Sequence, residues 1–596
     1  MSRTFTNIRG RCVAQASRAP DDINAPIQEV KTEISMELDS ARRVRLVRVV
    51  MWAATITAGL LQTLAVRFYI SGDGNSYLDV ASAYLRGDFA NAINAYWSPF
   101  YSWLIALVLW VFKPGGYWET TILHLLNFAG LLLALRAFEF FFGNFLAARQ
   151  NLTQPEGESV ELPVTLWWTL GYALFINATL QVMAMYPITA PDHWVCIVTF
   201  LSIGLILKIS MRGGGPFLFG TLGLVLGLGY LTKAFYFPLA FVFIGTAWLA
   251  SRELRKNITG AMIAVVAFLL VAGPFVFALS TAKHRFTYGD VGKIAYAEVM
   301  NWGQEPMFWE GGDGSGTPKH PARIILSSPT VYEFAEPVAG SYPMWYDSSY
   351  WKDGMEIHFH PVNQLKVLRQ SAGTFFLIFL IQLEFVVGLA VLVFYDLRPR
   401  EWLSLAFRHW FLWFPAAAAC LGFTSVLVEG RYVASFLVVL WLAAFASSLC
   451  SASVATKRVA VAVVLAVTFV TVVKTLKYAA TDALAISKQV NENWEAAQKL
   501  EELGAHPGDR VALIGVLAEQ HVLRLANVKA VAELRYRDEQ KFWTGDPSLQ
   551  NRVFTAFAAT GSKIVIATHA PGTAVKEGWI RLGTTDYYAR SLLAKP

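Results

Sequence analysis

The sequence is poor in charged residues and in cysteine for its length. Asp, Glu, Lys and Arg make up 16% of its 596 residues, against about 25% in typical globular chains, which argues against a purely soluble multidomain enzyme. The four cysteines form no CxxC pair and no Cys/His spacing typical of metal ligands, so we expect neither a disulfide framework nor structural zinc. The run 511–515 carries one glycine and no GxGxxG motif, so a nucleotide site is unsupported.

Apolar and aromatic residues are abundant instead. Hydrophobic residues make up 55% of the chain and the mean hydropathy is +0.42, while 41 Phe, 22 Tyr and 20 Trp suit a large bilayer-interface surface. The net charge is +7, but most Lys and Arg lie in short loops beside apolar runs and form no basic stripe, so we expect no nucleic-acid partner. The composition predicts a polytopic α-helical membrane protein.

The first 46 residues are expected to be a disordered cytoplasmic tail. Residues 1–40 are polar and mixed in charge, without the apolar segment of a cleavable signal peptide. Four arginines then precede the first apolar run: Arg42, Arg43, Arg45 and Arg48. Because basic residues favour the inner side, we expect a multi-pass protein of the cell (inner) membrane with its N-terminus in the cytoplasm.

Eleven apolar runs approach the roughly 20 residues that a spanning helix needs. They lie at 47–70, 119–142, 163–186, 193–210, 216–232, 234–250, 258–280, 371–395, 408–429, 432–450 and 458–478. A shorter run at 99–112 suits an interfacial or re-entrant helix. If this run does not span, the basic loops after 142, 210, 250, 395 and 450 all fall inside, as the positive-inside rule requires. We therefore expect a transmembrane domain of about eleven helices over 47–478, with one interfacial helix on the outer face.

This topology assigns the large loops and the C-terminal part to one side of the membrane. The outer segments are the loop 71–118, the turn 186–193, the loop 281–370 and the tail 479–596. In the tail, short buried strands near 510–515 and 563–567 alternate with amphipathic helical patterns. We expect a small soluble α/β domain over 479–596, on the outer (periplasmic) side.

The first outer loop carries an acid just past the first apolar run. Asp73 precedes Tyr77 in a short polar segment, and Trp97 lies before Pro99 at the entry to the short apolar run. A carboxylate at the edge of the bilayer is partly desolvated, a condition under which carboxylates act as general bases. The alternative is that Asp73 simply caps a helix beginning near Asn75.

Further candidates lie at the outer ends of other apolar runs: Asp192, His193, Lys233, Glu429, Arg431 and Tyr432. A charge at the centre of a membrane helix costs roughly 2.5–3.5 kcal/mol and is by default a functional hypothesis. For Lys233 and Arg431 the alternative is that the side chains snorkel to the interface. For His193 it is that the ring caps the following helix.

The order of these residues resembles the GT-C superfamily of membrane glycosyltransferases, which includes protein O-mannosyltransferases and the lipid A aminoarabinose transferase. In that family the first outer loop carries an acid, a proline-aromatic helix follows, and a second acid ends the third span. Asp73, the segment 97–101, Asp192 and Arg431 occupy the matching places. Gly74 follows Asp73 where protein mannosyltransferases usually have Glu, so the resemblance does not identify the acceptor.

The resemblance implies an inverting glycosyltransferase at the outer face, moving a sugar from a polyprenyl-phosphate-linked donor to an acceptor hydroxyl of a glycan, lipid or protein. It implies Asp73 as the general base and Asp192 as a second acid that orients the acceptor. The expected phosphate-binding residues are Lys233, Arg431 and Tyr432. The expected substrate-binding residues are Tyr77, Trp97, His193 and Glu429.

Two histidines of the long outer loop raise the question of a metal. On a strand, the rings of His358 and His360 would point to one side, but the loop offers no clear third ligand. We therefore expect no cofactor and no bound metal, and attribute the pair to packing of the loop.

Two other classes of function remain open. A transporter or flippase of a lipid-linked saccharide would predict an inverted repeat, broken helices and charges at the bilayer midplane. A non-catalytic assembly scaffold would not need acids on two separate outer turns. Charges at the outer helix ends, a large outer loop and an outer domain favour the transferase.

The distribution of Arg and Lys generates a prediction on topology. Reporter fusions after residues 150, 255 and 400 are expected to report the cytoplasm, and fusions after 330 and 590 the outer side, because basic loops stay inside. An outward signal at 255 would contradict the eleven-span topology and the shared outer face of the site.

Overall fold

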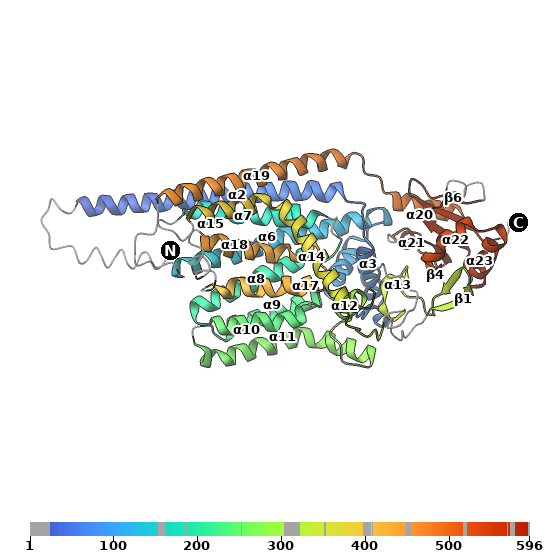
Figure 1. The fold of residues 1–596 in the computed structure, drawn as a ribbon. Coiled ribbons are helices and arrows are strands. Elements are labelled where there is room, and N and C mark those ends of the chain that lie inside the picture. The colour runs from blue at the N-terminus through green and yellow to red at the C-terminus, as the bar shows by residue number, and fades with distance from the viewer. Residues whose placement is uncertain are drawn as a thin grey trace.

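The fold, given by a computed structural model, is a long helical bundle with a sheet domain at one end (Figure 1). The bundle helices run roughly along one axis, and the C-terminus lies in the sheet domain. The described residues are 24–152, 162–185, 189–251, 253–302, 322–350, 353–396, 404, 407, 409–448, 454–515, 521–568, 570–571 and 578–593.

Six helices are, within those residues, individually long and apolar enough to cross a membrane. They are α2 (Asn24–Ala65), α6 (Glu119–Leu152), α8 (Asp192–Arg212), α11 (Leu254–Lys283), α18 (Gly430–Ser448) and α19 (Val454–Ile486). A seventh span results if the bent pair α14 (Pro361–Ile381) and α15 (Leu383–Asp396) is counted as one. These helices confirm the predicted polytopic α-helical membrane protein.

The other predicted spans form shorter apolar helices. These are α7 (Val164–Asn177), α9 (Pro216–Thr232), α10 (Tyr236–Ala250) and α17 (Trp410–Thr424). α7 continues directly through a π-helical turn, η3 (Ala178–Val182), and a 3-10 turn, η4 (Met183–Met185). At 1.5 Å per residue the 17 residues of α9 rise about 26 Å, less than the roughly 30 Å of bilayer hydrocarbon. The total of about eleven spans therefore stays a prediction.

Two segments lie between the helical bundle and the sheet domain, and we expect both on the outer side. The first contains α3 (Gly72–Leu85), α4 (Phe89–Ala92), α5 (Pro99–Phe112) and η2 (Gly116–Trp118). The second contains α12 (Val291–Trp302), α13 (Pro343–Tyr346) and η5 (Ser348–Tyr350).

Helix α5 is the short apolar run that we expect at the membrane interface. With 14 residues it is too short to span the bilayer. Its Leu109 lines a small cavity together with Leu78 of α3 and Leu126 near the outer end of α6. Trp103 and Trp110 on its other side are exposed, as expected of aromatic side chains at headgroup level.

The bend between α14 and α15 is held by polar side chains inside the bundle. The two helices meet at 84° around Gln382, whose side-chain amide donates to Asn177 Oδ1 at 2.9 Å. Lys474 of α19 donates to the Ile381 carbonyl and to Glu384, the latter at 3.0 Å. The bend is thus tied to the end of α7, where the π-helical turn begins.

The sheet domain combines the C-terminal part with a hairpin from the long outer loop. Its strand order is β1-β2-β4-β3-β5-β7-β6, with β3 parallel to β4 and β5 and the other pairs antiparallel. The strands are β1 (Arg323–Ser327), β2 (Thr330–Glu333), β3 (Arg510–Ile514), β4 (Lys529–Leu534), β5 (Ile564–Thr568), β6 (Ile580–Arg581) and β7 (Tyr587–Ser591). The helical elements are α20 (Glu492–Glu502), α21 (His521–Leu525), η6 (Tyr536–Asp538), α22 (Glu539–Thr544) and α23 (Pro547–Ala559). β3 and β5 are the strands that the sequence predicts, whereas the sequence analysis does not predict the β1–β2 hairpin.

The sheet domain packs directly onto the first outer loop and the start of α6. Leu78 of α3, Leu123 of α6 and Val522 of α21 belong to one buried apolar cluster. His521 and Arg524 extend from α21 into the same interface, where both contact polar residues of α3. The domain is therefore attached by a continuous core and not only by its linker.

The buried His521 generates a prediction on pH. Burial lowers the pKa of His521 to about 4, although Glu119 and Asp79 oppose that shift and Arg524 assists it. The unfolded chain takes up a proton below its ordinary pKa near 6.5 while the folded one does not, so stability is full above about 6.5 and declines as the pH falls toward 4. We expect a loss of roughly 3 kcal/mol over that range, seen as a falling Tm between pH 7 and 4.5.

The variant His521→Asn keeps a hydrogen-bonding group near Asn75 and removes the titration. Its Tm is expected to fall less between pH 7 and 4.5 than the wild-type Tm. Equal losses in the two proteins would show that other groups set the acid sensitivity.

Candidate functional site

Most of the predicted residues meet where four parts of the chain come together, on the side of the bundle that we expect to be the outer one. They are Asp73 in the first turn of α3, Asp192 at the start of α8, Lys233 between α9 and α10, and Glu429, Arg431 and Tyr432 at the start of α18. Each of these elements begins or breaks at the end of an apolar helix. The charges are therefore brought together at the edge of the bundle without being placed in its middle.

The guanidinium of Arg431 lies at the centre of the cluster. It is 3.1 Å from Asp73 Oδ2, 3.6 Å from Asp192 Oδ2 and 2.5 Å from Glu429 Oε2. The Arg431 side chain is 15% exposed and that of Asp192 is 1% exposed. The charged end of Arg431 faces three carboxylates of the protein, unlike the charged end of an arginine that snorkels to the membrane interface.

Lys233 provides a second cation on the other side of Asp192. Its Nζ is 3.3 Å from Asp192 Oδ1 and 3.5 Å from the centroid of the Tyr432 ring. The backbone of Lys233 is extended (φ −152°, ψ 120°) and ends α9, so the side chain leaves the helix and turns toward the acid. Tyr432 contacts both cations, since its hydroxyl accepts from Arg431 at 3.2 Å.

The N-terminus of α3 does not depend on Asp73. The helix begins at Gly72, and the cap is Ser71, whose hydroxyl accepts from the Gly74 backbone N–H at 3.2 Å. The alternative interpretation of Asp73 as a cap for a helix starting near Asn75 is therefore wrong. The Asp73 carboxylate is left to pair with Arg431.

Two glycines allow the elements to approach closely enough for these contacts. A Cβ at Gly74 would lie 2.6 Å from Thr189 Oγ1, in the turn that leads to Asp192. A Cβ at Gly430 would lie 2.7 Å from the Val182 carbonyl oxygen, at the end of the π-helical turn. Any larger residue would push α3 or α18 outward and separate the acids from Arg431.

The three remaining candidates lie around the cluster without entering it. Tyr77 packs edge-on against Trp97, with ring centroids 5.0 Å apart. Burial, followed by the charges of Asp73 and Asp192, raises the pKa of the Tyr77 phenol, so this side chain stays neutral. His193 lies on the side of α8 that packs against Gly130 of α6.

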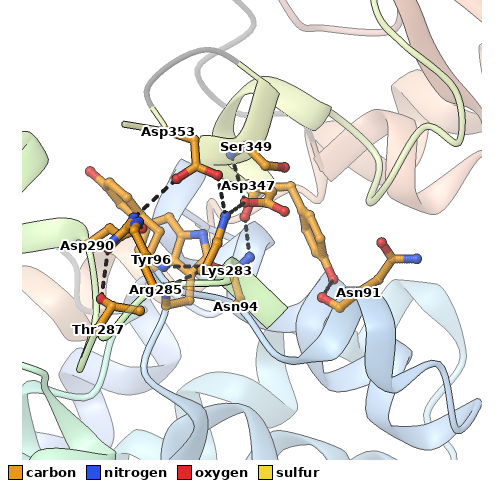
Figure 2. A network of polar contacts seen from close by, with 12 residues as sticks. Asn91, Asn94, Tyr96, Lys283, Arg285, Thr287, Asp290, Asp347, Ser349 and Asp353 are labelled. Atoms are coloured by element: carbon orange, nitrogen blue, oxygen red, sulfur yellow. Dashed lines mark hydrogen bonds and ion pairs between the residues drawn. The ribbon is translucent and has the colours of Figure 1, made fainter. Parts of the chain in front are cut away.

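The long loop 281–370 contacts the first loop, 71–118, through a polar network that is separate from the charged cluster (Figure 2). Lys283, at the end of α11, is 3.0 Å from Asp353 Oδ2 and 3.7 Å from Asp347 Oδ1, and Arg285 joins Asp353 at 3.2 Å. From the first loop, Asn94 donates to the Tyr346 carbonyl at 2.7 Å. These contacts hold the loop over the Tyr77–Trp97 pair, and Trp97 itself donates to a carbonyl of that loop.

The two histidines of the long loop do not lie on a strand, which is the arrangement that would have pointed both rings to one side. His358 and His360 are exposed, and His360 immediately precedes α14. Within the described part of the chain, no group of three or more His, Cys, Asp or Glu is arranged to hold a metal ion.

Other polar residues of the outer face were not singled out from the sequence. Asn75, Asp79, Glu119, His521 and Arg524 meet between α3, α6 and α21. The sequence signal for Asp79 was its place in the same short polar segment as Asp73. Arg524 lies in a short helix of a soluble domain, where an arginine is ordinary and carries no signal.

Comparisons with known proteins identify structures of similar architecture. No family model and no curated protein matches the sequence. The chain is similar to the apo structure of ArnT from Cupriavidus metallidurans, with a TM-score of 0.46 and 13% identity over 92% of this chain and 99% of that one. It is also similar to the apo oligosaccharyltransferase of Archaeoglobus fulgidus, with a TM-score of 0.48 and 12% identity over 88% of this chain and 69% of that one.

Proposed function

We propose that the protein is an inverting glycosyltransferase that moves a sugar from a polyprenyl-phosphate-linked donor to an acceptor hydroxyl at the outer face of the membrane. The observation that supports this most is the joining of Asp73 and Asp192, from two separate outer turns, by Arg431 at the edge of the helical bundle. Two acids and two cations at the ends of apolar helices match the needs of a lipid-phosphate donor and a hydroxyl acceptor.

Lys233 and Arg431 are proposed to bind the donor phosphate, with Tyr432 between them. Both cations are paired with carboxylates in this structure, so an incoming phosphate would compete with those carboxylates for the same donors. Charge-assisted hydrogen bonds to phosphate are strong enough to do so. Binding of the donor would then release Asp73 from Arg431 at the moment when a free carboxylate is needed.

In the transfer step, the acceptor oxygen attacks the anomeric carbon opposite the phosphate. The new C–O bond forms as the bond from that carbon to the phosphate oxygen breaks, and the bonding electrons leave with the phosphate. Asp73 takes the proton of the acceptor hydroxyl, while Lys233 and Arg431 stabilise the departing charge. Phosphate is a competent leaving group, so no protonating acid is required, in contrast to the two-carboxylate glycosidases.

The other candidates are assigned to binding. Asp192 is proposed to orient the acceptor, and Glu429 to hold Arg431 in place through their 2.5 Å contact. The aromatic pair Tyr77 and Trp97, under the long outer loop, is proposed to line the path of the sugar. His193 is proposed to contribute from the first turn of α8. The acceptor is a glycan, a lipid or a protein, and the mechanism uses no cofactor.

A second function, transport of a lipid-linked saccharide, is favoured by one observation. The 84° bend at Gln382 and the neighbouring Glu384–Lys474 pair are a broken helix with charges inside the bundle, which transporters use. Glu384 also accepts hydrogen bonds from Asn177 and Thr471. A charge pair with these additional partners inside the bundle is a structural contact. Release of free polyprenyl phosphate distinguishes the two functions, because a transporter leaves the donor intact.

Replacement of Asp73 by Asn tests the proposed base. The amide has the size of the carboxylate, and the α3 cap at Ser71 is untouched, but an amide cannot accept the proton. We expect a 10²–10⁴-fold loss of transfer with little change in Tm, measured as release of polyprenyl phosphate from a panel of polyprenyl-phosphate sugars. Asp192→Asn is expected to lose a comparable or smaller factor. A near wild-type rate in Asp73→Asn would refute the mechanism.

Replacement of Lys233 tests the phosphate site. Loss of a charge-assisted hydrogen bond to phosphate costs roughly 1.5–3 kcal/mol, so Lys233→Ala is expected to raise the donor KM or lower kcat/KM by about ten- to hundredfold, and Lys233→Arg by less. Lys208→Ala is the matched control, because Lys208 lies on α8 near the Phe140 ring and away from the cluster. Unchanged donor turnover in Lys233→Ala would exclude a phosphate-binding role.

A further inference from the structure

We propose that the sheet domain is part of the catalytic apparatus, and that Arg524 is a positioning residue that fixes α3 and thereby Asp73. This inference rests on the proposed function, since it concerns the residue assigned as the base. It gives a role to a domain that carries none of the proposed catalytic residues.

Arg524 donates four hydrogen bonds that join the sheet domain to the membrane part. Its Nη1 donates to Asp79 at 2.9 Å, its Nε to Glu119 at 2.9 Å, and its Nη2 to Glu119 at 2.6 Å and to Ser82 at 2.9 Å. The side chain is 14% exposed. A planar guanidinium whose three nitrogen atoms all donate to α3 or α6 restricts the orientation of α21 relative to these two helices.

The contacts of α3 fall on two opposite faces of the helix. Asp73 and Tyr77 are four residues apart and share the face toward the charged cluster. Asn75, Asp79 and Ser82 follow the same helical spacing half a turn away, and all three contact α21. Asn75 Oδ1 lies 2.9 Å from His521 Nδ1, so the domain reaches within two residues of Asp73.

Asp79 also joins the long loop 281–370 to the same point. Its carboxylate accepts from the Ser341 backbone N–H at 2.7 Å and from the Ser341 hydroxyl at 3.1 Å, in addition to Arg524. The first loop, the long loop and the sheet domain thus meet on one side chain of α3. Apolar packing alone would hold the domain in place, whereas charged hydrogen bonds also fix its register.

Fixing the register matters because catalysis depends on small displacements. A shift of about 1 Å in a reacting group lowers a rate by about a hundredfold. Asp73 lies in the first turn of α3, held from one side by Arg431. If the donor phosphate takes Arg431 away from Asp73, the hydrogen bonds of Arg524 and His521 are the contacts that keep α3 in place.

The test compares Arg524→Ala and Arg524→Lys in the full-length protein. Arg524→Ala is expected to lower kcat by ten- to hundredfold with the donor KM changed less than about twofold, and Arg524→Lys is expected to recover part of the loss. Asn491→Ser is the matched control. It removes the Asn491 contact to the Tyr117 carbonyl in the same interface, keeps an oxygen to cap α20, and leaves α3 untouched. The control is expected to keep near wild-type kcat.

Two further measurements separate positioning from general loss of structure. The double variant Asp73→Asn/Arg524→Ala is expected to be no slower than Asp73→Asn alone, because a displaced helix costs nothing once the base is gone. Hydrogen exchange of residues 72–85 is expected to rise in Arg524→Ala and not in Asn491→Ser. If Arg524→Ala does not fold, Asp79→Asn carries the same comparisons.

Each outcome decides a different claim. Multiplying losses in the double variant, or unchanged kcat and exchange in Arg524→Ala, would overturn the positioning role while leaving Asp73 as the base. An active Asp73→Asn single variant would instead overturn the proposed function, and the positioning role with it.

Discussion

The guanidinium of Arg431 makes the contacts on which the charged cluster depends. It contacts carboxylates from α3, from α8 and from the segment before α18. A buried cation without partners costs several kcal/mol, and so does each buried acid left without its cation. The contacts of Arg431 therefore join the ends of these elements, and Lys233 pairs with the second oxygen of Asp192.

The same solution recurs at other levels of the helical bundle. Glu139 of α6 accepts from Arg48 of α2 at 2.8 Å, and Glu384 of α15 accepts from Lys474 of α19 at 3.0 Å. Apolar side chains do not by themselves draw helices together in lipid, because the tails around them are equally apolar. Paired charges therefore specify which helices pack together. The pairs around Arg431 differ from the Glu139 and Glu384 pairs because they lie beside the turns where we propose that the substrates bind.

Sequence reasoning located most of the charged cluster because charge beside a long apolar run is rare. The same reasoning located the apolar helices and the strands β3 and β5. It could not show that Arg431 meets Asp73, which lies 358 residues earlier, nor that a hairpin at 323–333 joins the C-terminal sheet. The role of Arg524 could not be predicted for the same reason, because the two acids that it contacts are brought to it by the fold. The cap at Ser71 could have been predicted from its hydroxyl before a polar helix.

The hairpin β1–β2 has a consequence for how the protein is made. β2 pairs with β4, and Tyr342 just after it donates to Glu533 of β4 at 2.7 Å, 191 residues along the chain. During synthesis the hairpin is released early and must wait, with an open strand edge, while α14, α15, α17, α18 and α19 are inserted into the membrane. Unpaired edges are sites of aggregation, so completion of the bundle and closure of the sheet are coupled steps of biogenesis.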